Sequence, residues 1–299
     1  MGKRALITGV QGFTGRYMAL ELHRAGYEVF GLAHVLDATP VPGVHATYAC
    51  DLTDAAAVSK VLAEIKPDFV VHLAAIAFVA HGDIDAIYRT NVLGTRNLLQ
   101  ALVALETPLQ AVLLASSANV YGNSTAGVLE ESTSPAPAND YAVSKLAMEF
   151  MAKLYIGRLP LFFVRPFNYT GLGQSESFLL PKIISHVRRR AAVIELGNLD
   201  VERDFSDVRV VVAYYRRLLE HPVMPGDTFN ICSGIGHTLH DVLAQARLLA
   251  GYDFEVRVNP AFVRNNEVKT LIGSRLKLEQ TVGVVPDIPL ADTLEWMMS

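Results

Sequence analysis

The sequence predicts an α/β protein with a doubly wound parallel sheet and a smaller C-terminal α+β lobe. Short apolar runs rich in β-branched residues alternate with helical patterns through the first two-thirds of the chain. Strands that are apolar on both faces are typical of a parallel sheet covered by helices on both sides. After about Arg165 the alternation gives way to loops containing proline and glycine, which indicates a second lobe.

The elements follow in chain order. We expect the parallel strands at residues 5–7, 28–32, 69–73, 111–115 and 161–164, with long helices at 84–105 and 141–155. Further on, we expect a helix from about Phe178, a strand at 228–232, and helices at 240–249 and 290–298. The predicted division is an N-terminal domain of residues 1–165, with returning segments near 205–235, and a smaller lobe formed mainly by residues 166–299.

A glycine-rich turn directly follows the first strand and opens a helix. Its spacing is Gly-x-x-Gly-x-x-Gly, where backbone amides and the helix N-terminus can meet a diphosphate that side chains would obstruct. The alternative is a tight turn that needs positive φ at Gly9 or Gly12. The position after a first strand favours a Rossmann-type dinucleotide site, with the cofactor contacts Gly9, Gln11, Gly12, Phe13, Thr14 and Gly15.

The end of the second strand bears on the choice of dinucleotide. Sites for NAD place an acidic residue there to accept from the ribose 2′-hydroxyl, and this chain has Ala33, His34 and Val35 instead. His34 could contact a 2′-phosphate, so NADP(H) is favoured over NAD(H). Asp51 and Leu52 are expected to contact the adenine; alternatively, Asp51 caps a helix that starts near Thr53.

Three side chains form a candidate catalytic group. Tyr141 stands four residues before Lys145 on a predicted helix, so we expect the lysine cation to lower the tyrosine pKa from about 10 and make the phenol a usable acid or base. Ser117 follows the strand 111–115, at the edge of the sheet where ligands bind, and can bond a substrate oxygen. A Ser-Ser pair is more often a helix cap, but its place before Tyr141 favours catalysis.

The composition limits the classes of partner and site. The chain has 299 residues, of which 51% are apolar and 19% charged, and its formal net charge of -4 gives no electrostatic footprint for nucleic acid or an anionic membrane. Cys50 and Cys232 are too few for a disulfide framework or a metal cluster, so we expect no metal and a reducing compartment. Neither a leader nor an apolar run of about 20 residues is evident, and we expect a cytoplasmic protein.

Six segments together resemble the extended short-chain dehydrogenase/reductase family: residues 8–15, 51–52, 72–75, 91–99, 116–122 and 141–145. The resemblance implies that Ser117, Tyr141 and Lys145 are catalytic and that Lys145 also holds the nicotinamide ribose. It adds Leu73, Ala74, Ala75, Asn91 and Tyr141 to the cofactor contacts. Asn91 lies where the family has an irregularity in the helix near the lysine; alternatively, it is an ordinary polar helix residue.

The C-terminal segments 165–168, 178–182, 203–205, 229–234 and 264–267 look like the GDP-mannose 4,6-dehydratase branch of that family, which includes GDP-6-deoxy-4-keto-mannose reductases. The likeness implies a GDP-linked 4-keto-6-deoxy sugar as substrate, with its GDP portion held by Asn168, Lys182, Arg203, Arg264 and Glu267. Glu267 would accept the N–H donors of guanine. Ala77, Phe78 and Ser117 would contact the sugar, with His81 nearby on the same loop.

The residue at position 119 distinguishes a dehydratase of this branch from a reductase. Dehydratases place a glutamate two residues after the catalytic hydroxyl, whereas this chain has Asn119, and an amide cannot exchange a proton near neutral pH. We therefore expect an NAD(P)H-dependent reduction of the C4 ketone that gives GDP-D-rhamnose or GDP-6-deoxy-D-talose. The alternatives are a 4-epimerase or 4,6-dehydratase with tightly bound cofactor and, with less support, a non-catalytic binding protein.

The resemblance also implies a homodimer, formed through the outer faces of the helices at 84–105 and 141–155.

Overall fold

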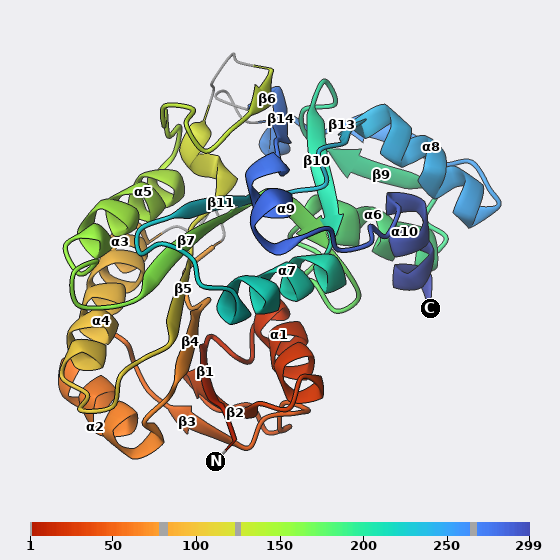
Figure 1. Cartoon of the computed structure of the whole chain (residues 1–299). Coiled ribbons are helices and arrows are strands. Elements are labelled where there is room, and N and C mark those ends of the chain that lie inside the picture. The colour runs from red at the N-terminus through yellow and green to blue at the C-terminus, as the bar shows by residue number, and fades with distance from the viewer. Residues whose placement is uncertain (1, 78–82, 123–126, 264–267) are drawn as a thin grey trace.

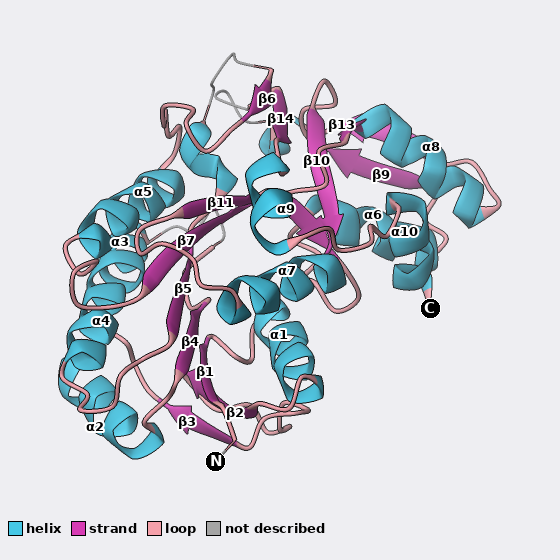
Figure 2. Cartoon of the chain, in the orientation of Figure 1, coloured by secondary structure: helices cyan, strands magenta, loops and turns pink. Residues whose placement is uncertain are grey.

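The computed structural model describes residues 2–77, 83–122, 127–263 and 268–299. Its centre is a seven-stranded sheet in which all neighbouring strands pair in parallel (Figures 1 and 2). From edge to edge the strands are β11 (Thr228–Ile231), β7 (Leu161–Pro166), β5 (Ala111–Ala115), β4 (Phe69–His72), β1 (Arg4–Thr8), β2 (Glu28–Ala33) and β3 (Ala46–Ala49). The chain extends the sheet from β1 towards β3 and then crosses back to β4. The carboxyl ends of β1 and β4 are thus the switch point at which such sheets bind ligands.

Helices cover both faces of this sheet (Figure 1). One face packs against α1 (Phe13–Arg24), α7 (Val208–Glu220) and α9 (Leu276–Val282). The other packs against α2 (Ala55–Ile65), α4 (Thr95–Val103) and α5 (Asp140–Lys153), and α3 (Ile84–Tyr88) lies beside α5. The five strands expected from the sequence are present, and β4 and β5 are buried along their whole length. The doubly wound fold is confirmed.

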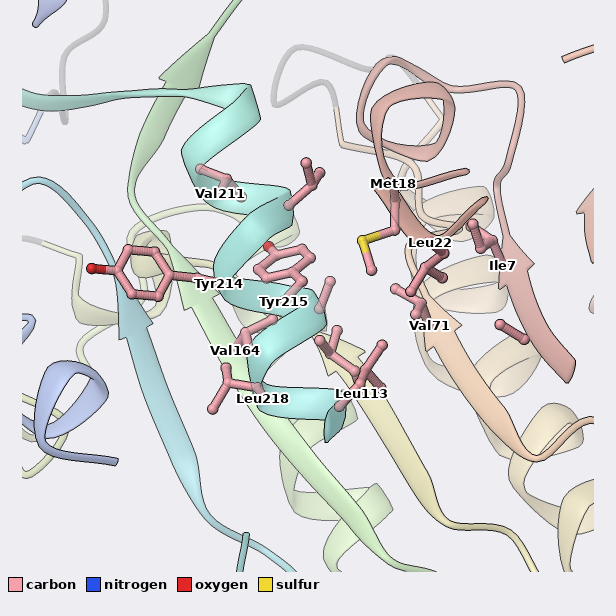
Figure 3. Packing of buried hydrophobic residues seen from close by; sticks show 14 of the residues in the cluster. Ile7, Met18, Leu22, Val71, Leu113, Val164, Val211, Tyr214, Tyr215 and Leu218 are labelled. Atoms are coloured by element: carbon pink, nitrogen blue, oxygen red, sulfur yellow. The ribbon is translucent and has the colours of Figure 1, made fainter. Parts of the chain in front are cut away.

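Helix α7 supplies much of the core on its face of the sheet. Figure 3 shows Val211, Tyr215 and Leu218 of this helix packed near Leu113 and Val164 of the sheet, with Met18 and Leu22 of α1 alongside. Tyr215 is buried and lies on the side of the helix that faces the strands. A segment far along the chain therefore closes the core of the N-terminal sheet.

The C-terminal lobe has its own sheets and core. Its strands are β6 (Val128–Leu129), β8 (Asn168–Thr170), β9 (Val193–Leu196), β10 (Glu202–Asp207), β12 (Gly236–Thr238), β13 (Glu255–Val258) and β14 (Thr270–Gly273). β10 pairs with β8, β12 and β14, β14 with β6, and β9 with β13. A separate apolar cluster joins α6 (Leu179–Arg188), α8 (Leu239–Ala250) and α10 (Leu290–Met298). The helices expected from Phe178, at 240–249 and at 290–298 are confirmed.

Both cysteines are free and buried. In the described part of the chain, no group of three or more His, Cys, Asp or Glu side chains is arranged to hold a metal ion. None of the described helices is long and apolar enough to cross a membrane.

Candidate functional site

The glycine-rich turn lies at the switch point and is packed closely against the segment after β4. Gly9 has φ +69°, and a Cβ on it would lie 3.0 Å from the backbone N and Cα of Ala74. A Cβ on Gly15 would meet the carbonyl oxygen of Gly9. The N-cap of α1 is Gly12, so no side chain caps the first amides of the helix. A narrow turn that leads to uncapped amides has the shape and partial charge that fit a diphosphate.

The ends of β2 and β3 form the expected adenosine side of the site. The Nδ1 atom of exposed His34 lies 4.0 Å from Oδ2 of Asp51. The other carboxylate oxygen of Asp51 accepts hydrogen bonds from the amide and the hydroxyl of Thr53, both at 2.8 Å. The cap of α2 is Asp54, which accepts from the amides of Ala56 and Ala57. Asp51 therefore orders a turn before α2 and does not cap that helix.

Arg16 is a cation that sequence reasoning missed. Its Nε donates to the carbonyl of Gln11 at 2.9 Å, and its Nη2 donates to Oδ2 of Asp37 at 2.7 Å. These contacts connect the glycine-rich turn to the loop that follows β2 and His34. The sequence could have indicated this residue, since a cation directly follows Gly15, the last glycine of the turn.

The three candidate catalytic side chains come together at the carboxyl end of β5. Ser117 follows β5 and begins a 3₁₀ turn at Ala118–Tyr121, while Tyr141 and Lys145 lie on the first turns of α5. All three are buried. The Nζ atom of Lys145 donates to the carbonyl of Ala115 at 2.8 Å and lies 6.0 Å from the centre of the Tyr141 ring.

The expected lowering of the Tyr141 pKa is wrong for this arrangement. Burial raises the pKa of Tyr141 to about 12, and the hydrogen bond with Ser117 opposes only part of that rise. Burial also lowers the pKa of Lys145 to about 8, although the negative charge of Glu149 opposes this. The sequence spacing placed the cation one turn away, but removal of the phenol from water is the larger effect. At neutral pH Tyr141 is therefore an uncharged phenol with a proton to give.

The helix expected at 84–105 is interrupted where the family resemblance implied. A π-helical turn at Arg89–Gly94 separates α3 from α4 and buries Asn91. The Oδ1 atom of Asn91 accepts from the amide of Ile76 at 2.9 Å, and its Nδ2 donates to the hydroxyl of Ser144 at 3.0 Å. Asn91 thus connects the segment after β4 to the residue beside Lys145 on α5, and the alternative of an ordinary helix residue is wrong.

His72 lies in a buried chain of hydrogen bonds that begins at the glycine-rich turn. The Thr95 hydroxyl donates to the carbonyl of Asn91 at 2.8 Å, so it accepts the proton of His72 Nε2 at 2.7 Å. His72 Nδ1 then accepts from the Thr8 hydroxyl at 2.7 Å, and Thr8 accepts from the amide of Ala74 at 3.1 Å. Burial and the nearby charge of Lys145 lower the pKa of His72 to about 3. The ring is neutral in the fold.

This neutral histidine predicts a stability that falls in acid. The pKa of His72 is about 6.5 in the unfolded chain and about 3 in the fold, so between those values only the unfolded chain binds the proton. The unfolding free energy should therefore fall as pH drops below about 6.5, by up to about 1.4 kcal/mol per pH unit from this group. Urea unfolding of wild type and His72→Gln between about pH 7 and about pH 5 should give a smaller slope for the variant.

His221→Gln is the control, because His221 is exposed at the end of α7. Equal slopes for His72→Gln and the wild type would show that His72 is not held neutral by the fold.

The structure describes three of the five residues expected to hold the GDP portion. Asn168 begins β8. Arg203 on β10 is buried, and its Nη1 donates to the carbonyls of Glu202 and Lys269, both at 2.9 Å. Arg264 and Glu267 lie outside the described residues, as do Phe78 and His81 on the expected sugar side. Ala77 is exposed and lies at the end of a described segment.

Lys182 lies at a surface pocket of the C-terminal lobe. Its Nζ donates to the carbonyl of Glu195 at 2.7 Å and lies 4.0 Å from the centre of the Phe262 ring. The pocket has a volume of about 420 Å³ and is lined by Lys182, His186, Val193, Glu195, Arg257 and Phe262. Its lining brings the cations of Lys182 and Arg257 beside the Glu195 carboxylate and the exposed Phe262 ring. Such cations can bind phosphate oxygens, and such a ring can stack on a flat base.

Tyr169 connects the two lobes next to the glycine-rich turn, a contact that the sequence did not reveal. Its hydroxyl lies 2.7 Å from the hydroxyl of Thr14, and its ring stacks on the Phe13 ring with 6.1 Å between the two ring centres. Because Tyr169 directly follows Asn168 on β8, the expected substrate strand and the expected cofactor turn are in contact.

Comparisons with known proteins agree over nearly the whole chain. Residues 6–297 match the sequence profile of the GDP-mannose 4,6 dehydratase family. A GDP-6-deoxy-D-talose 4-dehydrogenase from Aggregatibacter actinomycetemcomitans is 36% identical over 94% of this chain and 91% of its own. A GDP-6-deoxy-D-mannose reductase from Pseudomonas aeruginosa is 33% identical over 100% of this chain and 97% of its own.

Solved structures show the same fold. A crystal structure from Burkholderia cenocepacia J2315, provisionally described as an epimerase, is 53% identical with a TM-score of 0.91 and covers 99% of this chain and 97% of its own. RMD from Pseudomonas aeruginosa in complex with NADPH is 31% identical with a TM-score of 0.86, and it covers 100% of this chain and 97% of its own. MoeE5 in complex with UDP-glucuronic acid and NAD is 25% identical with a TM-score of 0.87, and it covers 97% of this chain and 96% of its own. The chain belongs to the GDP-mannose 4,6-dehydratase family, a branch of the extended short-chain dehydrogenases/reductases.

Proposed function

We propose that this protein is a nucleotide-sugar oxidoreductase that reduces the C4 ketone of GDP-4-keto-6-deoxy-D-mannose to GDP-D-rhamnose or GDP-6-deoxy-D-talose. The observation that carries the proposal is the buried group formed by Ser117, Tyr141 and Lys145 at the carboxyl end of β5. Two relatives that each cover more than nine-tenths of the chain have names that refer to GDP-6-deoxy sugars. The amide of Asn119, where a dehydratase needs a carboxylate, argues against elimination.

The chain's own residues supply the proton and the charge stabilisation. A reduced nicotinamide, when bound, supplies the hydride that forms the new C–H bond at C4, and the electron pair of the C=O π bond moves to the oxygen. Tyr141 gives its phenolic proton to that oxygen, and Ser117 donates a hydrogen bond to it as its charge grows. Lys145, charged below its pKa of about 8, stabilises the tyrosinate until a proton returns.

A nicotinamide dinucleotide is the cofactor, and we propose that NADP(H) is preferred to NAD(H). No acidic residue stands at the end of β2, His34 is exposed there, and Arg16 reaches the loop beyond it through Asp37. The relative solved with NADPH supports this preference, whereas the relative solved with NAD does not. The glycine-rich turn, Asp51, Leu52, Leu73, Ala74, Ala75 and Asn91 complete the proposed cofactor contacts.

A substrate that carries GDP is recognised, in this proposal, mainly by the C-terminal lobe. The pocket at Lys182 offers cations for phosphate oxygens and Phe262 for a flat base. Asn168, next to the lobe contact made by Tyr169, is proposed to contact the GDP portion of the same substrate. Arg203, Arg264 and Glu267 keep the roles that the family resemblance implied.

The test mixes the purified protein with GDP-4-keto-6-deoxy-D-mannose and NADPH or NADH, follows the loss of absorbance, and assigns the C4 configuration of the product by NMR. Stoichiometric oxidation of the cofactor with a rhamno or talo product is the expected result. Conversion of GDP-mannose or a UDP-sugar without net oxidation, and no reduction of the keto sugar, would show an epimerase or a dehydratase instead.

We propose a homodimer that pairs the outer faces of α3 to α5. Val143 and Phe150 of α5, with Leu154 at its C-cap, form an exposed apolar stripe. Ile84 of α3 and Leu93 of the π-helical turn are also exposed. The side chain of Phe150 is 61% exposed, so Phe150→Glu should convert the dimer to a monomer in light scattering without loss of folding. Leu248→Glu is the matched control, since Leu248 is 82% exposed on distant α8. A wild-type monomer, or a dimer that survives Phe150→Glu, would contradict the proposal.

A further inference from the structure

Asn119 makes two hydrogen bonds to the candidate catalytic hydroxyl. Its backbone amide donates to Oγ of Ser117 at 3.2 Å, and its side-chain Nδ2 donates to the same oxygen at 3.1 Å. Both bonds form within the 3₁₀ turn that Ser117 caps. Ser117 is buried, so water has little access to its oxygen.

A hydroxyl has one proton to donate and two lone pairs that can accept. The two N–H groups of Asn119 occupy both lone pairs of Ser117 Oγ. The remaining proton of Ser117 is therefore left to donate to another oxygen, and a hydrogen bond between Ser117 and Tyr141 lowers the pKa of Tyr141. A hydroxyl whose lone pairs are both occupied can donate a hydrogen bond to an oxyanion, but it cannot accept a hydrogen bond from the substrate.

We propose that Asn119 is a positioning residue that holds Ser117 as an obligate hydrogen-bond donor, whose single proton is directed to the reacting oxygen. The inference rests on the proposed function. It gives Asn119 a role in the reduction itself, beyond the replacement of the glutamate that dehydratases use. The oxygen at C4 gains negative charge during reduction, and a preorganised donor is most effective towards a developing charge. An aspartate at position 119 would instead place an acceptor oxygen where Nδ2 of Asn119 now donates, so the Ser117 proton would turn towards it and away from the reacting oxygen.

The central test is Asn119→Asp, which keeps the size of the side chain and replaces the Nδ2 donor with an acceptor oxygen. We expect kcat to fall by about 10- to 100-fold, because one oxyanion donor is misdirected. KM for the sugar and the dissociation constant for NADPH should stay within about twofold, since ground-state binding is unaffected. The NADPH dissociation constant also shows that the variant is folded.

A double-mutant cycle separates positioning from a general structural effect. If Asn119 acts through Ser117, then in the Ser117→Ala background Asn119→Asp should change kcat by less than about twofold. In the Ser116→Ala background the full loss should remain, because the Ser116 hydroxyl is buried and has no hydrogen-bond partner among the described residues. Ser116→Ala itself is therefore the matched removal of a neighbouring hydroxyl.

The outcomes distinguish this inference from the proposed function. A wild-type reductase in which Asn119→Asp keeps full activity, or lowers kcat equally with and without Ser117, would overturn only the role of Asn119. A wild type that instead epimerises a nucleotide sugar would end the reductase proposal, and the same cycle measured on that reaction would still test Asn119, since Ser117 acts on the C4 oxygen there too. Failure of the wild type to convert any of these sugars would overturn both.

Discussion

Tyr141→Phe is expected to lower kcat by about 10²- to 10⁴-fold, the usual contribution of a general acid, while NADPH binding is nearly unchanged. The variant loses the phenolic proton and little else, because Tyr141 makes its apolar contacts through a ring that phenylalanine retains. Steady-state oxidation of NADPH with the keto sugar gives kcat, and fluorescence titration gives the cofactor dissociation constant. Retention of more than about a tenth of kcat would show that another group supplies the proton.

Tyr155→Phe is the matched control for this change. Tyr155 lies just after the same helix, and it is 8% exposed, as is Tyr141. It packs in the apolar cluster on the far side of the sheet from α1 and α7. Removal of its hydroxyl should leave kcat unchanged, so a loss limited to Tyr141→Phe reports chemistry and not a disturbed helix.

The pH profile of the wild type should follow Lys145 on its alkaline side. Tyr141 keeps its proton up to a pKa of about 12, whereas Lys145 loses its charge near its pKa of about 8. Because only the charged lysine stabilises the tyrosinate, kcat should be full below about pH 8 and fall as pH rises through that value. A profile that is flat to about pH 10 would show that the lysine charge does not matter for turnover.

The sequence predicted the N-terminal sheet well because burial on both faces leaves a pattern in the residues themselves. Runs such as Phe69–His72 and Ala111–Ala115 have few polar residues, and they form the central strands β4 and β5. The same reasoning missed α7, whose Val-Arg-Val-Val-Val sequence is rich in residues that favour strands. That segment is helical because Asp207 caps it and because its apolar residues pack against α1 and the sheet, and neither partner can be seen from local propensity.

The candidate site likewise combines local features that the sequence predicted with long-range contacts that it did not reveal. The spacing of Tyr141 and Lys145 on one helix, and the glycine spacing after β1, are local and were predicted. The contact of Thr14 with Tyr169 joins residues 155 positions apart, and that of Thr8 with His72 joins residues 64 apart. Such pairs follow from the crossovers of the sheet and not from any motif. The direction of the Tyr141 pKa shift was wrong for the same reason, since burial is a property of the assembled fold.

The second large effect is expected at the ion pair between Arg165 of β7 and Glu149 of α5. Arg165 donates from Nε and Nη2 to the two carboxylate oxygens at 2.9 and 2.6 Å, and their side chains are 7% and 1% exposed. Arg165 also donates to the Tyr121 hydroxyl at 3.1 Å. Arg165→Met keeps an unbranched apolar side chain but leaves the Glu149 carboxylate buried without its partner. The unfolding free energy should fall by about 3–5 kcal/mol, measured as a shift of the urea midpoint.

Two controls assign this loss to the unpaired charge. Arg257→Met removes an equally close bidentate pair with Glu255, at 2.8 Å for both bonds, but those side chains are 58% and 55% exposed. The loss of stability there should be much smaller, because water solvates the remaining carboxylate. Adding Glu149→Leu to Arg165→Met removes the stranded carboxylate and should restore most of the stability, because buried apolar pairs match or exceed buried ion pairs. If the double variant were no more stable than Arg165→Met, the loss would come from packing around Tyr121 and not from charge. If Arg165→Met cost no more than Arg257→Met, burial would not govern the strength of this pair.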